Sequence, residues 1–201
     1  MAYRRTERTE ARLAEARERI VSAALAQVAD GGYASASVQA VAARAGVATG
    51  TVYRHFPSKV DLFAEVFRRQ ATQELGVLEQ IADRDEPALD RLAEAAEALA
   101  RRALASPTLA YAQIAEPVEQ RVEAERLVLR LGYRDAFARI LADGVERGEL
   151  EPHDTQTYGA AILGALSEAL VSPLGARQHS EALIASLVNF VTGRASALSN
   201  A

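Results

Sequence analysis

Residues Ser37–Lys59 read SVQAVAARAGVATGTVYRHFPSK, and the fold of the surrounding chain can be worked out from this stretch. Its first part carries apolar residues at the spacing i, i+3, i+4 and i+7, which places them on one face of a helix: Val38, Val41, Ala42 and Ala45. Gly46 interrupts that pattern, and a second short run, Gly50–Phe56, ends before Pro57, because proline disfavours helical angles in the residue before it. The stretch therefore predicts two short helices joined by a glycine turn, a helix-turn-helix.

The second run has an unusual composition for so short a helix. Val52 and Phe56, four residues apart, can hold it against the first helix. Most of its other side chains are hydroxyl, aromatic or cationic groups, and a lysine follows one turn later: Thr49, Thr51, Tyr53, Arg54, His55 and Lys59. Taken singly, such residues are common at surfaces. Taken together, they suit a helix that enters the major groove of DNA, where hydroxyls, lysines and helix-start amides fix the protein on phosphates.

Three motifs follow one another here: alanine-glycine-valine at 45–47, threonine-valine-tyrosine-arginine-histidine-phenylalanine at 51–56, and serine-lysine at 58–59. In this order they resemble the signature of the TetR family of bacterial transcriptional regulators, over roughly residues 15 to 65. The resemblance implies a three-helix DNA-binding domain over residues 1–58 with a basic amino-terminal arm. It also implies a helical effector-binding and dimerisation domain over residues 59–201, with about nine helices in all.

Two positions depart from the family pattern. Many members have serine just before the recognition helix, whereas this chain has Ala48, so the cap must come from Thr49 or be absent, at a cost of roughly 1 kcal/mol. Many also begin the first short helix with threonine followed by serine or threonine, but here Ala36 precedes Ser37, which is the only hydroxyl left for that phosphate contact. The expected DNA-contact residues are Ser37, Thr49, Gly50, Thr51, Tyr53, Arg54, His55 and Lys59.

Composition supports an all-α protein without cysteine chemistry. The 201 residues are 49% hydrophobic and 25% charged, which is ordinary for a globular chain, and no stretch shows the two-residue alternation of a sheet surface. The absence of cysteine excludes disulfides, thiol redox sensing and cysteine-ligated metal sites, and the three histidines are scattered. The sequence therefore predicts no metal site and no cofactor.

No catalytic pattern is visible. The chain has no nucleophile motif or phosphate-binding glycine loop, and its many carboxylates alternate with arginines as on solvated helix faces. We therefore expect no enzyme activity.

The amino terminus has no apolar run behind its arginines, which argues against a signal peptide. The longest apolar stretch, Tyr158–Leu174, contains Glu168 and Pro173 and falls short of the roughly 20 residues of a membrane span. We expect a cytoplasmic protein without a membrane partner.

Charge is divided unevenly along the chain. Residues 1–70 hold 11 Lys and Arg against 7 Asp and Glu, a balance of +4, whereas residues 71–201 hold 12 against 20, a balance of −8. A basic segment around a helix-turn-helix is expected if only that end meets a polyanion, although helix surfaces can produce such an imbalance by chance. The arm residues Arg4, Arg5 and Arg8 either reach DNA or form a solvated terminus.

Helices are predicted on both sides of the central stretch. The run Thr9–Asp30 carries an apolar stripe and ends at Gly31-Gly32. The run Lys59–Ile81 would span on the order of 35 Å, and the family resemblance implies that it links an effector pocket to the DNA contact. Prolines and a glycine divide the remainder into four or five further helices, placed at roughly 87–105, 108–115, 117–147, 154–171 and 180–197.

The carboxyl-terminal part offers a candidate pocket and a candidate interface. Isolated polar and aromatic residues in apolar surroundings are candidate pocket residues, although each is also common in cores or at surfaces: Tyr111, Gln113, Tyr133, Phe137, Tyr158 and Glu168. The last two helices are apolar on more than one face, which favours burial on two sides. Because family members dimerise through this pair, the expected interface residues are Leu163, Leu166, Leu170, Leu183, Leu187, Phe190 and Val191. A purely intramolecular core is the alternative.

Together these features predict a homodimeric DNA-binding transcriptional regulator. We expect a repressor that occupies a palindromic double-stranded DNA operator and is released by a small apolar effector. The alternative is a helical dimeric interaction module that retains the fold without specific DNA binding. Its support in the sequence is the pair of departures at Ala36 and Ala48.

Overall fold

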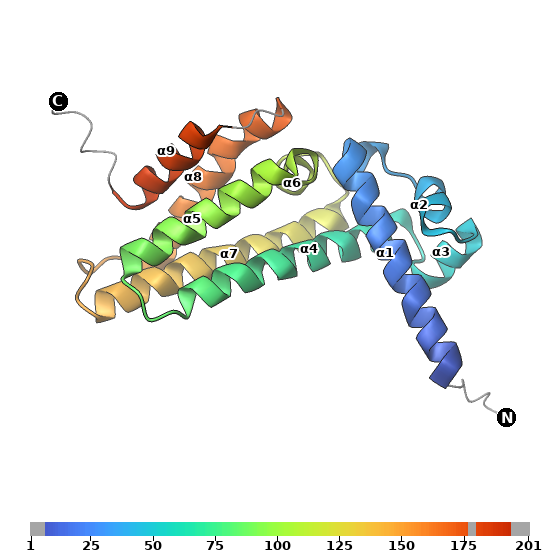
Figure 1. Ribbon diagram of the computed structural model, residues 1–201, viewed down its shortest axis with the longest axis horizontal. Helices are drawn as coiled ribbons and strands as arrows, with labels where there is room; N and C mark the ends of the chain where they lie inside the picture. The colour runs from blue at the N-terminus through green and yellow to red at the C-terminus, as the bar shows by residue number, and fades with distance from the viewer. Residues whose placement is uncertain (1–6, 177–179, 194–201) are drawn as a thin grey trace.

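The computed structural model describes residues 7–176 and 180–193, which form nine α-helices and no strand. The helices are α1 (Glu7–Ser35), α2 (Val38–Ala45), α3 (Thr49–His55), α4 (Lys59–Ala82), α5 (Ala88–Ala105), α6 (Pro107–Ile114), α7 (Gln120–Glu146), α8 (Thr155–Gly175) and α9 (Glu181–Val191). Figure 1 shows α1, α2 and α3 gathered at one end of an elongated molecule, with α4 and α7 running along its length. The prediction of an all-α fold is confirmed.

Polar side chains placed just before the helices explain several of the observed starts. The Ser37 hydroxyl oxygen accepts a hydrogen bond from the backbone N–H of Ala40 at 3.1 Å, which caps α2. Ser58, Asp154 and Ser180 cap α4, α8 and α9 in the same way. These caps are local features of the sequence, because each lies within three residues of the N–H group that it accepts from.

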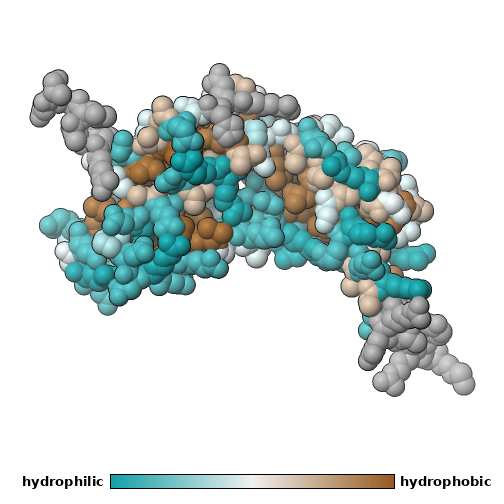
Figure 2. Space-filling model, viewed as in Figure 1, coloured by the Kyte–Doolittle hydropathy of each residue, from teal (hydrophilic) through white to brown (hydrophobic). Residues whose placement is uncertain are grey.

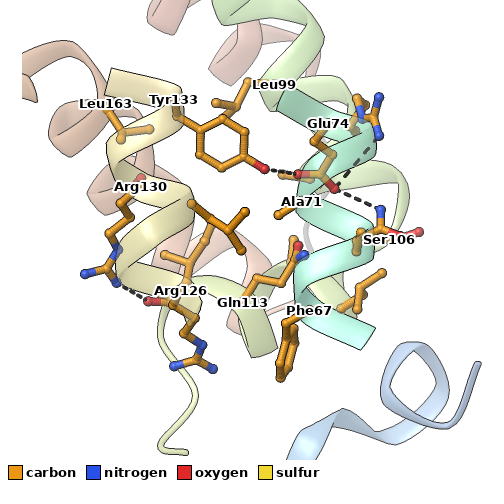
Figure 3. Close-up of a pocket in the computed structure, with 18 of the residues that line it drawn as sticks. Phe67, Ala71, Glu74, Leu99, Ser106, Gln113, Arg126, Arg130, Tyr133 and Leu163 are labelled. Carbon is orange, nitrogen blue, oxygen red and sulfur yellow. Dashed lines mark hydrogen bonds and ion pairs between the residues drawn. The ribbon is translucent and has the colours of Figure 1, made fainter. Parts of the chain in front are cut away.

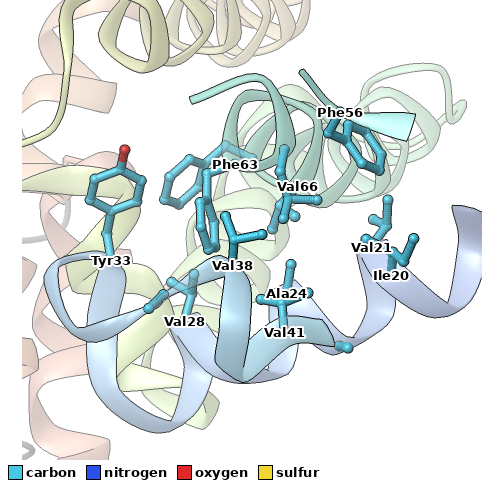
Figure 4. Packing of buried hydrophobic residues seen from close by; sticks show 14 of the residues in the cluster. Ile20, Val21, Ala24, Val28, Tyr33, Val38, Val41, Phe56, Phe63 and Val66 are labelled. Atoms are coloured by element: carbon cyan, nitrogen blue, oxygen red, sulfur yellow. The ribbon is translucent and has the colours of Figure 1, made fainter. Parts of the chain in front are cut away.

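The first hydrophobic core joins α1, α2 and α3 to the start of α4 (Figure 4). The predicted apolar stripe of α2 is buried, and so are Val52 and Phe56, which hold α3 in place. Tyr33 packs edge-on against Phe63, with ring centroids 5.3 Å apart. Leu109 and Ala112 from α6 and Val122 from α7 also enter this core, so the amino-terminal helices are packed directly against the rest of the chain.

The second core fills the long bundle of α4 to α9. Helix α4 contributes to both cores: its first turns, from Leu62 to Phe67, pack in the first core, and its last turns, from Leu78 to Ala82, pack in the second. Since one continuous helix is buried at both ends, a displacement in the bundle can be carried to the helix-turn-helix. The predicted Lys59–Ile81 run corresponds to α4, which reaches from the first core into the second.

Helix boundaries differ from prediction at several places. Helix α1 does not stop at Gly31-Gly32 but breaks at Gly32 (φ 81°, ψ 173°) and then makes one more turn to Ser35. Helix α8 passes through Pro173 to Gly175, because a proline in the last turn removes only one backbone donor at the end of the helix. The last predicted helix was extended to residue 197, but α9 ends at Val191, and residues 194–201 lie outside the described part.

The extension of α8 also corrects the expectation about membrane-spanning length. At 21 residues, Thr155–Gly175 is long and apolar enough by length and composition to cross a membrane, which the shorter predicted stretch was not. One such helix is weak evidence, because a core helix passes the same test. Here α8 packs against α5, α6 and α7 and supplies Leu166 and Leu170 to the second core.

Candidate nucleic-acid interface and effector cavity

Helix α3 presents polar side chains to solvent while its apolar side chains hold it in place. Val52 is 1% exposed and Phe56 is 4% exposed, whereas Tyr53 is 46% exposed. Arg54 is exposed, and within the described residues no carboxylate pairs with it. The arrangement leaves an aromatic hydroxyl and an unpaired guanidinium available to a polyanion.

The other α3 residues of the predicted contact set lie around this exposed face. Thr49 and Thr51 are half-buried, and Gly50 is exposed with open space where a side chain would project. Ala48 occupies the N-cap position with extended backbone angles and makes no side-chain cap hydrogen bond. Of the two outcomes foreseen from the sequence, a cap from Thr49 or none, the structure shows none.

His55 differs from an exposed phosphate ligand. Its ring is half-buried, and the Nε2 atom is covered without a hydrogen-bond partner among the described residues. Burial lowers the pKa of His55, and the nearby cations Arg17 and Arg54 lower it further. The imidazole is therefore neutral near pH 7, so it can offer one hydrogen bond but no charge.

Ser37 and Lys59 are already engaged within the chain. The Ser37 oxygen caps α2 and is half-buried, which leaves its hydroxyl proton as the group available to a phosphate. The Lys59 ammonium lies 4.6 Å from the centre of the Tyr33 ring and 3.5 Å from the Tyr33 carbonyl oxygen. Lys59 would have to leave Tyr33 to reach DNA, a contact across the fold that its sequence position does not reveal.

Most of the basic amino-terminal arm lies outside the described residues. Arg4 and Arg5 lie outside the described residues. Arg8 falls within α1, but its side chain is outside the described part. The predicted role of this arm therefore stays a prediction.

A cavity of about 370 Å³ lies among α4, α5, α6, α7 and α8 (Figure 3). Its walls are mainly apolar, and charged or amide groups punctuate them. The apolar walls come from Phe67, Ala71, Leu99, Ala103, Leu109, Ala110, Ile114, Leu129 and Leu163. A largely apolar hollow with a few polar groups is the usual form of a small-molecule site.

A hydrogen-bonded cluster around Glu74 forms one polar part of the wall. The Tyr133 hydroxyl donates to a Glu74 oxygen at 2.9 Å, and the Gln70 amide donates to the other oxygen at 2.9 Å. Arg102 lies 4.0 Å from the same carboxylate (Figure 3). Burial raises the pKa of Tyr133, and the Glu74 charge raises it further, so the phenol stays protonated and can donate.

Arg126 forms the second polar part of the wall. It is 5% exposed, lies over the Phe67 ring at 5.5 Å, and donates to the carbonyl oxygens of Glu116, at 2.8 Å, and Ala112. Burial lowers its pKa, and Glu123, 3.0 Å away, acts in the opposite direction. Its Nε atom has no partner among the described residues.

The structure separates the six predicted pocket residues into two groups. Gln113 and Tyr133 line the cavity. Four do not: Phe137 is fully buried in the second core, Tyr158 is exposed beside the His153 ring, Glu168 is exposed on α8, and Tyr111 packs close to Gly175. The polar lining residues that the sequence reasoning missed are Gln70, Glu74, Arg102, Ser106, Arg126, Arg130 and Ser167.

Several predicted interface residues are already buried within one chain. Leu163, Leu166, Leu170 and Leu187 are at most 8% exposed, because α8 and α9 pack these side chains against the bundle. Leu183 and Val191 are half-buried, and Phe190 is 52% exposed. Phe190 and small residues of α8 and α9 stay exposed in the single chain, whereas those four leucines do not.

Sequence comparison identifies the amino-terminal helices. Residues 20–66 match the family of bacterial regulatory proteins called the tetR family. The transcriptional repressor KstR of Rhodococcus jostii is 50% identical over 56 residues, which cover 28% of this chain and 26% of KstR. The match thus spans about a quarter of that relative. The fatty acid metabolism regulator protein of Bacillus subtilis is 26% identical over 156 residues, covering 76% of this chain and 80% of that protein.

Solved structures extend the similarity of fold to most of the chain. FadR from Bacillus subtilis, in complex with stearoyl-CoA, superposes with a TM-score of 0.77 at 23% identity, covering 87% of this chain and 97% of FadR. FadR from Bacillus halodurans gives a TM-score of 0.77 at 22% identity, covering 89% and 95%. The helix-turn-helix at residues 20–66 thus matches the tetR family of bacterial regulatory proteins, and the all-α fold of most of the chain is shared with these solved structures.

Proposed function

We propose that the chain is a cytoplasmic transcriptional repressor that binds a palindromic operator as a homodimer and leaves it when a small effector enters the cavity. The observation that carries the proposal is the exposed polar face of α3, with Tyr53 and Arg54 outward and Val52 inward. The repressor KstR and the Bacillus subtilis regulator, whose sequences are similar, support it. Residues 1–58 would form the DNA-binding domain and residues 59–201 the effector and dimer domain.

The proposed DNA contacts have two roles: some position the protein on the phosphates, and one recognises a base. Tyr53, Thr49, Thr51 and the hydroxyl of Ser37 would bind phosphates, which fix register without carrying sequence information. Arg54 would reach a base edge, where a guanidinium can bind guanine through two hydrogen bonds. Gly50 would allow the backbone to approach the duplex, since nothing lies within 4 Å of where its side chain would project.

The cavity is suited to an effector with an acyl chain. Its apolar walls can receive a hydrocarbon tail, and Gln113, Arg126 and Arg130 offer donors to a polar or anionic end. The FadR structure, similar in fold, was solved in complex with stearoyl-CoA, which supports this class of ligand. An effector acts only through its preference for one conformation of the dimer, because equal affinity for both would leave DNA binding unchanged.

Fluorescence anisotropy with DNA from the promoter region adjoining its own gene tests the assignment. Tyr53→Ala should weaken binding to all sequences, whereas Arg54→Ala should relax preference at one base pair, worth about 1–3 kcal/mol of discrimination. Arg139→Ala removes an exposed arginine on α7 and is the matched control. Affinity should fall as salt rises, because phosphate contacts release counterions. Unchanged affinity in both α3 variants contradicts the proposal.

The alternative, an interaction module without specific DNA binding, has one structural observation in its favour. Ala48 leaves the start of α3 without a side-chain cap. A gel shift with the same promoter DNA separates the two functions. A retarded band that survives excess unrelated DNA supports the repressor, and its absence supports the interaction module.

A further inference from the structure

A single carboxylate joins the carboxyl-terminal bundle to the entry of the helix-turn-helix. Glu116, between α6 and α7, accepts hydrogen bonds from the backbone N–H groups of Tyr33 and Ala34, both at 2.8 Å. These N–H groups open the short turn that follows the break in α1 at Gly32, where a carboxylate acts as a helix cap. We call Glu116, Tyr33 and Ala34 the junction clamp.

Gly32 is shaped to receive this carboxylate. Its φ of 81° and ψ of 173° lie in a region that side-chain-bearing residues rarely adopt. A Cβ atom at this position would lie 3.0 and 3.1 Å from the two Glu116 carboxylate oxygens. Glycine is therefore needed both for the backbone turn and for the close approach of Glu116.

Tyr33 is held from two further directions. Its hydroxyl donates to Glu119, three residues beyond Glu116, and the Lys59 ammonium at the start of α4 lies over its ring. Burial raises the pKa of Tyr33, and the hydrogen bond to Glu119 raises it further, so the phenol remains a donor. The turn before α2 is thus fixed by the loop between α6 and α7 and by the first residue of α4.

The same loop is continuous with the cavity wall. Helix α6 supplies Gln113 and Ile114 to the cavity, and Glu116 follows two residues later. Arg126, which also lines the cavity, donates to the Glu116 backbone carbonyl at 2.8 Å. A ligand that displaces α6 or draws Arg126 toward itself would move Glu116, because both contacts set the position of that residue.

We propose that Glu116 is a positioning residue that couples occupation of the cavity to the orientation of α2 and α3, an inference that rests on the proposed function. An occupant that shifts α6 withdraws the carboxylate from Tyr33 and Ala34. The turn before α2 then loses its cap, and the α2–α3 unit changes its angle to α4. By linkage, DNA that holds the clamp closed weakens effector binding by the same factor.

The variant Glu116→Gln tests the clamp with little change of shape, and Glu79→Gln, at an exposed site on α4, is the matched control. Amide hydrogen exchange at Tyr33 and Ala34 should be faster in Glu116→Gln and unchanged in Glu79→Gln. This readout needs neither DNA nor effector. Equal protection of the two amides in wild type and Glu116→Gln overturns the clamp.

The second readout is the ratio of DNA dissociation constants with and without stearoyl-CoA as the probe. Allosteric coupling commonly changes affinity about 5- to 150-fold, and in Glu116→Gln we expect the ratio to fall below about threefold. The stearoyl-CoA dissociation constant of the DNA-free protein should stay within about twofold of wild type, since Glu116 does not line the cavity. Glu116→Asp, which keeps the charge, should restore part of the coupling.

The two ideas fail in different ways. DNA release from the wild-type protein by stearoyl-CoA measures the proposed function alone. If Glu116→Gln releases DNA with the same ratio as wild type, the clamp is wrong and the proposed function stands. Gly32→Ala, which crowds the carboxylate from the opposite side, should lose coupling in parallel with Glu116→Gln.

Discussion

At the scale of single residues, the start of α3 is under-stabilised. Ala48 has the extended backbone angles of an N-cap residue but no side chain that can accept a hydrogen bond. Ala48→Ser should therefore raise the free energy of unfolding by about 1 kcal/mol. Urea denaturation measures the change, and Ala43→Ser, at an exposed position within α2, is the control that adds a hydroxyl without a capping role. Equal effects of the two substitutions contradict the capping argument.

Glu65 on α4 makes stability depend on acid pH. Burial raises the pKa of Glu65, but hydrogen bonds from Arg68, Arg69 and Arg17 outweigh that effect and lower it from 4.5 to about 2. The native state therefore binds this proton less readily than the unfolded state, and the stabilisation is present above pH 4.5 and lost as pH falls toward 2.

Thermal unfolding between pH 2 and pH 6 tests the role of Glu65. The melting temperature of wild type should fall more steeply with acidification than that of Glu65→Gln, whose amide cannot titrate. Glu79→Gln should follow the wild-type curve, since Glu79 is exposed and makes no ion pair with the described residues. If the melting temperatures of wild type and Glu65→Gln fall in parallel with pH, Glu65 does not contribute to the acid dependence of stability.

At the scale of helices, the sequence predicted elements better than it predicted which faces line the cavity. Local signals such as the Ser37 and Ser58 caps mark helix starts without knowledge of the fold. Tyr33 and Glu116 are 83 residues apart, and no local pattern pairs them. Helix α8 is apolar on several faces, so periodicity could not distinguish the inward Leu166 from residues left for a second copy.

Two of the cavity residues that the sequence reasoning missed, Glu74 and Arg126, can be recognised in the sequence as charges within apolar helix stripes. Glu74 interrupts the apolar stripe of α4 that includes Phe67, Ala71 and Leu78, at spacings of four, three and four residues. Arg126 interrupts the stripe of α7 in the same way. A charged residue on an inward-facing stripe must find a partner or border a hollow. Searching for charges within apolar stripes, instead of isolated aromatics, would have identified both positions.

The contact between α7 and α8 depends on one glycine. A Cβ atom at Gly159 would lie 2.7 Å from the Arg134 carbonyl oxygen and 3.0 Å from the Ala138 backbone nitrogen. Gly159→Ala should therefore push the two helices apart and cost about 1–3 kcal/mol, as overpacking usually does. Gly76→Ala in α4 meets nothing within 4 Å and should gain up to about 1 kcal/mol. Urea denaturation should show a lower free energy of unfolding for Gly159→Ala and a higher one for Gly76→Ala. A higher free energy of unfolding in both variants would show that α7 and α8 can separate without cost.

At the scale of the whole molecule, α8 and α9 form the surface that would receive a second copy under the proposed function. Figure 2 shows hydrophobic side chains exposed around the carboxyl-terminal helices, while the lower edge along α4 and α7 is largely hydrophilic. The exposed residues on α8 and α9 are mostly small, which permits close helix approach: Ala160, Ala161, Gly164, Ala169, Ala182 and Ala185. Phe190 on α9 adds a large apolar side chain to this surface, at 52% exposed.

This surface leads to a prediction about assembly and DNA binding together. Phe190→Arg would place a cation in the proposed interface and should convert a dimer into a monomer, as measured by light scattering after size exclusion. Leu127→Arg, at a 55% exposed site on α7, makes the same chemical change elsewhere and should leave the dimer intact. DNA affinity should fall with Phe190→Arg, because a monomer contacts one half-site while a dimer contacts two, about 34–36 Å apart. A dimer that survives Phe190→Arg but dissociates with Leu127→Arg would move the interface from α8 and α9 to α7.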